Sequence, residues 1–123
     1  MNVRGVRGAI TCEVDTPDAI LSATRKLLEA ILAANLQLQP EDLASALFTV
    51  TDDLTSAYPA RAARELGWDQ VPLLCTREIP VPTGLPRCIR ILLHWNTNLP
   101  QSAIRHVYLG EAAVLRPDLI PTG

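Results

Sequence analysis

Arginines are the residues of this chain with the clearest chemical potential, and single carboxylate, thiol and phenol groups accompany them. Arg90 lies in the apolar run of residues 88–93, and Arg7 lies in the N-terminal run of residues 3–9. Burying a cation without a partner is costly, so Arg90 predicts an anion or water beside it. The other candidates for a catalytic role are Glu78, Cys75 and Tyr108.

This combination predicts a binding site for a small organic dianion. Arginine forks bind carboxylates in bidentate fashion, while glutamate and tyrosine form hydrogen bonds with hydroxyl groups. Three more arginines, Arg61, Arg64 and Arg116, are available to support such a site. The sequence has no metal-ligand spacing, no Ser-His-Asp order and no glycine-rich phosphate loop, so it predicts neither a metal nor a cofactor.

Each candidate also has an ordinary structural role open to it. Glu78 alone suits the surface, Cys75 alone suits the core, and Tyr108 alone suits a packed position with its hydroxyl bonded to the backbone. Cys75 and Glu78 raise a geometric question, because residues an odd number apart on an ideal strand point to opposite faces. They share one site only if the strand ends or bulges near Thr76; otherwise they serve different sites in an oligomer.

Strands and helices must hold these side chains, and the hydrophobic pattern predicts their order. Thr16 and Pro17 begin a helix, as N-cap and first helical residue, and an apolar stripe carries it to about Asn35. A second helix covers residues 60–66 and ends at Gly67. The predicted strands are residues 3–12, 47–51, 71–79, 87–97 and 106–109, with a helical turn at 100–104 and a turn at 110–113. This order predicts an α+β fold, a mixed sheet with two helices packed on one face.

Length and composition indicate one ordinary globular domain, expected to span residues 1–123. A net charge of −2, from 11 basic and 13 acidic residues, argues against a general nucleic-acid surface. No apolar run approaches the ~20 residues of a membrane span, and the N-terminus lacks the apolar core of a secretory signal. Cys12, Cys75 and Cys88 leave one thiol unpaired in any disulfide scheme, which favours a cytoplasmic location.

Several short motifs follow one another along nearly the whole chain. They are RGVRGA at 4–9, YPARAAREL at 58–66, VP at 71–72, the segment 75–78, RCIR at 87–90, RHVYL at 105–109 and LRPDL at 115–119. Together they resemble the monofunctional chorismate mutases of the trimeric α+β class, as distinct from the all-helical class. The resemblance implies a homotrimer whose three sheets form a pseudo-α/β-barrel with active sites at subunit interfaces.

The resemblance also implies an activity, the rearrangement of chorismate to prephenate in phenylalanine and tyrosine biosynthesis, beyond the shikimate pathway. This reaction needs no nucleophile, acid, base or cofactor, only a compact substrate conformer and a stabilised ether oxygen. Arg90 is expected to reach that oxygen, Arg7 and Tyr108 a substrate carboxylate, and Glu78, helped by Cys75, the ring hydroxyl.

By the same resemblance, a larger set of residues is expected to line the substrate site, and residues 115–123 are expected to form a flexible C-terminal tail. The set is Arg7, Tyr58, Arg61, Arg64, Leu74, Cys75, Thr76, Arg77, Glu78, Arg90, Tyr108, Leu115 and Arg116.

Two other functions fit parts of the pattern. One is an imine-hydrolysing deaminase of similar trimeric architecture, which would also set an arginine against a carboxylate; the characteristic acidic segment near its C-terminus is missing here. The other is a non-catalytic trimer that binds a small acid and regulates another protein. Arg90 together with Glu78 argues against it, because a binder has no need of a cation aimed at an ether oxygen.

Overall fold

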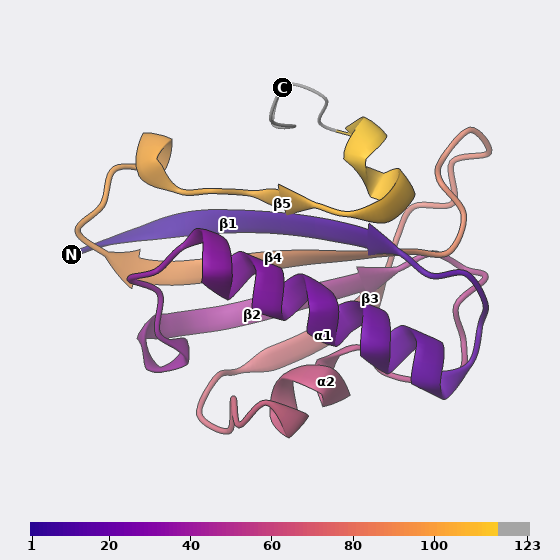
Figure 1. Cartoon of the computed structure of the whole chain (residues 1–123), viewed down its shortest axis with the longest axis horizontal. Coiled ribbons are helices and arrows are strands. Elements are labelled where there is room, and N and C mark those ends of the chain that lie inside the picture. Colours follow the sequence, from indigo (N-terminus) through magenta and orange to yellow (C-terminus); the bar gives the residue numbers. More distant parts are fainter. Residues whose placement is uncertain (116–123) are drawn as a thin grey trace.

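A single mixed β-sheet forms the centre of the computed structural model, which describes residues 1–115 (Figure 1). Its strands are β1 (Asn2–Thr11), β2 (Leu43–Val50), β3 (Leu73–Arg77), β4 (Cys88–Thr97) and β5 (Val107–Tyr108). Their order across the sheet is β3-β2-β4-β1-β5. The middle strand β4 is antiparallel to both neighbours, while the edge strands β3 and β5 run parallel to β2 and β1. The strand that carries Arg90 is therefore the central strand of the sheet.

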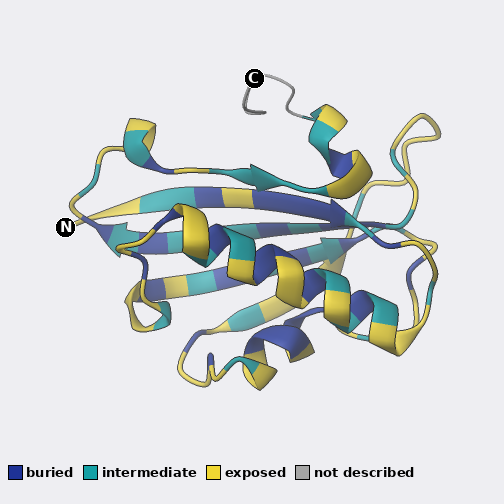
Figure 2. Cartoon of the chain, viewed as in Figure 1, coloured by how far each residue is buried: buried dark blue, intermediate teal, exposed yellow. Residues whose placement is uncertain are grey.

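Two helices, α1 (Pro17–Ala34) and α2 (Ala60–Glu65), lie on the same side of this sheet (Figure 1). The Thr16 side chain accepts a hydrogen bond from the Ala19 backbone N–H and so caps α1, as predicted. The buried stripe of α1 turns toward the sheet, and exposed residues occupy its outer side (Figure 2). After α2 the chain turns at Gly67, whose φ of +89° is a left-handed conformation that glycine adopts without strain. Three short 3₁₀ helices complete the described chain: η1 (Pro40–Asp42), η2 (Gln101–Ala103) and η3 (Gly110–Leu115).

The two faces of the sheet differ in chemistry because side chains alternate along each strand. On β4, the buried Ile89, Ile91, Leu93 and Trp95 belong to the main hydrophobic core, together with the apolar stripe of α1. Arg90, Leu92 and His94 alternate with them and are only half-buried. We call the side of the sheet that bears these three residues, opposite α1 and α2, the open face.

Several predicted boundaries were wrong, and pairing between strands explains the two differences that concern β2 and β3. β2 begins at Leu43 instead of residue 47, because β4 continues to pair with it through residues of low strand propensity. β3 covers 73–77 instead of 71–79, since it is an edge strand that pairs only with β2. The turn predicted at 110–113 is part of η3, which includes Leu115. Within residues 1–115, the helices are too short or too polar to cross a membrane.

Candidate active site

Strand register brings the principal candidates into one row across the open face. Cα partners along this row are Tyr108 on β5, Ala9 on β1, Arg90 on β4, Thr49 on β2 and Thr76 on β3. A second row runs parallel to it through Arg7, Leu92, Leu47 and Leu74. Residues from both ends of the chain, among them Arg7, Arg90 and Tyr108, therefore meet on one surface.

Arg90 and Glu78 form the charged centre of this surface. The Arg90 Nε lies 3.5 Å from the Glu78 Oε1, and the two side chains are 32% and 24% exposed. Glu78 also accepts a hydrogen bond from the Thr49 hydroxyl. The Arg90 Nε is itself buried and has no hydrogen-bond partner among the described residues. The pair is thus partly neutralised, but a donor on the guanidinium remains available to a ligand.

A small apolar cluster surrounds Tyr108 at the end of the row. Ala9, Cys88 and Ala112 are buried there, and Tyr108 and Leu115 pack against them. Burial raises the pKa of the Cys88 thiol, although the nearby Arg90 guanidinium acts in the opposite direction, so the thiol is neutral at pH 7. Within residues 1–115 the buried Tyr108 hydroxyl has no hydrogen-bond partner. Like the Arg90 Nε, it is a polar group available to a ligand.

A cavity of about 410 Å³ lies beside these residues, and we call it the Arg90 cavity. Four of the predicted site residues line it: Arg7, Thr76, Glu78 and Arg90. Arg7 is exposed, and its backbone N–H donates to the His106 Nδ1 over 3.0 Å, which ties β1 to the segment before β5. Two guanidinium groups and one carboxylate therefore line one cavity.

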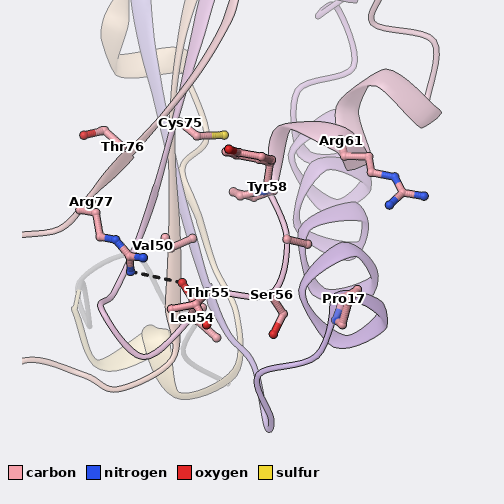
Figure 3. Close-up of a pocket in the computed structure, with 12 residues that line it drawn as sticks. Pro17, Val50, Leu54, Thr55, Ser56, Tyr58, Arg61, Cys75, Thr76 and Arg77 are labelled. Carbon is pink, nitrogen blue, oxygen red and sulfur yellow. Dashed lines mark hydrogen bonds between the residues drawn. The ribbon is translucent and has the colours of Figure 1, made fainter.

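A second cavity, of about 510 Å³, lies on the helix side of β3, and we call it the Tyr58 cavity. Tyr58 and Cys75 point toward one another across it (Figure 3). Arg61 also lines it, but its guanidinium points away from Cys75 and its Nε lies 3.1 Å from the Glu65 Oε1 (Figure 3). Arg77 lines it too, and donates to the Thr51 and Leu54 carbonyls. Arg77 thus supports a loop as well as lining the cavity.

The spacing of Cys75 and Glu78 has the geometric consequence foreseen in the sequence. Although β3 ends at Arg77, the Glu78 N–H still donates to the Val50 carbonyl over 2.9 Å, so the alternation continues. Cys75 packs against the main core and lines the Tyr58 cavity, whereas Glu78 lines the Arg90 cavity. Thr76 lines both cavities and points away from Cys75 (Figure 3). The predicted site residues of one chain therefore fall into two groups on opposite sides of β3.

The remaining candidates lie apart from both cavities. Leu74 is 60% exposed on the open face, Arg64 is exposed on α2, and Leu115 packs in the cluster around Tyr108. Arg116 lies outside the described residues, as does most of the predicted tail.

Thr49 and Ala9 were missed by the sequence analysis. Thr49 donates to Glu78, and Ala9 is the small residue between Tyr108 and Arg90 in the row. Side chains alternate along β2, so Thr49 points to the face of the sheet opposite that of the buried Phe48 and Val50. This alternation could have indicated Thr49 as a residue of the open face. Ala9 carried no such signal, because its position depends on pairing between distant strands.

Fold and site together define a small α+β protein with an arginine-lined cavity on the open face of its sheet. Within residues 1–115, no group of three or more His, Cys, Asp or Glu side chains is placed to hold a metal ion.

Comparisons with known proteins identify the family. The family model for chorismate mutase type I matches residues 3–119, so the chain belongs to this family of isomerases. It is 62% identical to chorismate mutase AroH of Thermus thermophilus over 117 residues, which are 95% of this chain and 96% of that protein. It is 48% identical to chorismate mutase AroH of Bacillus subtilis over 120 residues, 97% and 94% of the two chains. Its fold is similar to that of a chorismate mutase from Clostridium thermocellum, with a TM-score of 0.87 and 44% identity over 89% of this chain and 97% of that one.

Proposed function

We propose that the chain carries out the rearrangement of chorismate to prephenate at the Arg90 cavity, as a single cytoplasmic domain in aromatic amino-acid biosynthesis. In this reaction the ether C–O bond breaks while a new C–C bond forms within the same molecule. No proton, electron pair or group leaves the substrate, so the protein needs only to orient it and to stabilise the charge that develops. A cavity lined by arginines with one carboxylate suits that task.

Arg90 has the central role in the proposed mechanism. Its guanidinium N–H groups would donate to the ether oxygen, where negative charge builds as the bond breaks, and to a substrate carboxylate. Glu78 lies 3.5 Å from the Arg90 Nε and accepts from the Thr49 hydroxyl. From this position it would face the ring hydroxyl and the positive side of the ring. Arg7 and Tyr108 would bind the carboxylate of the migrating side chain.

The observation that carries the proposal is the pair of unsatisfied groups on the open face. The buried Arg90 Nε and Tyr108 hydroxyl lack hydrogen-bond partners among residues 1–115. Arg90 and Tyr108 lie in one row across the sheet, and Ala9 of β1 is the one residue of that row between them. Leaving a buried donor unpaired costs about 1–3 kcal/mol. A dianionic substrate would satisfy both groups, which supports substrate binding as the reason for the arrangement.

The experiment is to mix the purified chain with chorismate and to follow the loss of its ultraviolet absorbance, with Arg90→Ala as the inactive comparison. Conversion to prephenate by the unaltered chain supports the proposal. Release of ammonia from an imine without loss of chorismate would instead indicate a deaminase. Binding of chorismate without conversion would indicate a regulatory binder.

We also propose that the chain is a homotrimer whose active site is completed by a neighbouring copy. The open face carries a row of partly exposed leucines, Leu47, Leu92 and Leu74, with Leu74 60% exposed. Apolar rows of this kind mark protein interfaces. The Arg90 and Tyr58 cavities lie on opposite sides of β3 in one chain, so two copies could combine the Arg90 cavity of one with the Tyr58 cavity of the next.

Light scattering should give three times the 13.4 kDa mass of one chain, and a monomer mass at micromolar concentration would overturn the trimer. Complementation tests the shared site. Arg90→Ala disables one cavity, and Tyr58→Asp places a repelling carboxylate at a 74% exposed position in the other. Co-refolding the two inactive variants in equal amounts should restore about a quarter of full activity, because about a quarter of the interfaces then join two intact halves. No restoration would mean that each chain holds its whole site.

A further inference from the structure

The loop of residues 51–59 joins β2 to α2 and carries Tyr58 into the Tyr58 cavity. Two buried residues, Leu54 and Pro59, anchor the loop to the core. Between them, Thr55 and Ser56 are exposed and line the cavity, and Tyr58 is 74% exposed. Core packing therefore fixes the two ends of this stretch but not the backbone of Thr55 and Ser56.

Asp15, in the connection between β1 and α1, binds that stretch with four hydrogen bonds. Its Oδ1 accepts from the backbone N–H groups of Thr55 and Ser56 at 3.0 and 3.1 Å. Its Oδ2 accepts from the Thr55 hydroxyl at 2.9 Å, and the Ser56 hydroxyl donates to the Asp15 carbonyl at 3.0 Å. The nearby Ser56 side chain, which has the largest effect, lowers the pKa of the Asp15 carboxyl, as do the bonds from Thr55 and from the Ser56 N–H, so the group is ionised at neutral pH.

These contacts join segments about forty residues apart, and they are exposed. They add to the apolar anchoring of the loop, in which Leu54 belongs to the main core and Ala57 packs against it. Arg77 holds the start of the same loop through the Thr51 and Leu54 carbonyls. Arg77 thus ties the loop to β3 and Asp15 ties it to the β1–α1 connection, while Thr51 and Asp53 near its start accept from the Cys88 and Arg87 N–H groups.

We infer that Asp15 is a positioning residue for the active site: it holds the 51–59 loop so that Tyr58 stands ready to close on the substrate. The inference rests on the proposed function, in which the Tyr58 cavity forms one side of the site. A loop that is ordered before binding spares the substrate the cost of ordering it. When only a fraction of molecules has the competent loop, the apparent dissociation constant rises by the inverse of that fraction.

Asp15→Ala removes the carboxylate that accepts three of the bonds, whereas Asp15→Asn keeps an Oδ1 acceptor for both backbone N–H groups. If the competent loop falls to about a tenth of the population, Asp15→Ala should raise KM for chorismate about tenfold and leave kcat within about twofold. Asp15→Asn should bring KM back to within about threefold of the unaltered enzyme. Asp18→Asn, in the first turn of α1, removes the same charge nearby without touching the loop's bonds and should leave both constants unchanged.

Hydrogen exchange at the Thr55 and Ser56 amides gives a readout that does not depend on turnover. Asp15→Ala should speed exchange at these two amides at least tenfold, and Asp15→Asn should speed it much less. Unchanged exchange in Asp15→Ala overturns the inference and leaves the proposed function intact. Faster exchange with an unchanged KM also overturns it, because loop order then has no bearing on binding. An unaltered chain that fails to convert chorismate would refute the proposed function instead, while exchange would still report the Asp15 contacts.

Discussion

Replacement of Arg90 by citrulline removes the charge of the guanidinium and keeps a planar side chain with an Nε–H donor. The shape of the side chain and its Nε–H donor are preserved, so the substitution isolates the electrostatic effect of the positive charge on the breaking C–O bond. The Glu78 carboxylate, 3.5 Å away and 24% exposed, would then face the dianionic substrate without its neutralising partner. Loss of charge should therefore weaken substrate binding and also slow the reaction.

The size of the effect on kcat follows from Coulomb's law. A half-charge on the ether oxygen about 3 Å from a full positive charge is stabilised by about 3 kcal/mol at an effective dielectric constant of about 20. That free energy corresponds to about a hundredfold in rate, within the range of about 10²–10³ found when one preorganised donor is lost. We expect kcat for the citrulline variant to fall at least a hundredfold, with KM about tenfold higher because of the unpaired Glu78.

The assay is the loss of chorismate absorbance over a range of substrate concentrations, so that kcat and KM are obtained separately. Citrulline at Arg25, which pairs with Glu29 on the exposed side of α1, is the matched control and should change neither constant. If the Arg90 variant keeps kcat within about threefold and loses only KM, Arg90 is a substrate anchor and the transition-state role belongs to another group.

Three further predictions follow from individual residues. Cys75→Ala should keep at least about a third of kcat, because the thiol packs against the core; complete loss of activity with the fold intact would make it a reactive centre. Gly8→Ala should lower the free energy of unfolding by about 1–3 kcal/mol, since the new Cβ would lie 2.9 Å from the Ile31 Cδ1. In Gly5→Ala the new Cβ meets no atom closer than 3.7 Å, so this control should lose under about 1 kcal/mol. Equal urea midpoints for the two variants would contradict the prediction. Burial raises the pKa of the Cys12 thiol to about 11, so at pH 8 only about a thousandth of the thiol is ionised. Iodoacetamide should therefore label Cys12 at least a hundredfold more slowly in the folded chain than in the unfolded chain, as measured by mass spectrometry.

Local signals in the sequence were sufficient for the elements whose ends are set locally. Thr16 and Pro17 begin α1 because a side-chain cap and a fixed φ act within one turn, and Gly67 ends the segment of α2 by its positive φ. Strand ends were predicted less well, because they depend on the partner. β3 stops at Arg77, opposite Val50, the last residue of β2, although Ile79 shortly beyond it has good strand propensity.

The candidate site could be predicted in its chemistry but not in its arrangement. A charged Arg90 in an apolar strand and a nearby Glu78 indicate an anion site from residue types alone. The row that joins Arg90 to Tyr108 depends on the register of β1 against β4 and β5, which no local pattern specifies. Ala9 became meaningful only through that register, since its small side chain lies between the two strands that carry the polar groups.

The alternation of side chains on one edge strand gives the clearest physical argument for a shared site. Cys75 and Glu78 are three residues apart, and the backbone bond from Glu78 to Val50 keeps the strand from twisting one of them to the other side. Tyr58 and Arg90 of one chain line separate cavities on opposite sides of β3, so the strand stands between them. On the proposed trimer, each copy offers the Arg90 cavity to one neighbour and the Tyr58 cavity to the other, so the same strand serves two sites. Assembly and catalysis would then be lost together: a substitution that separates the copies at Leu74, which is 60% exposed and lines neither cavity, should abolish turnover even though the residues that line both cavities remain in place.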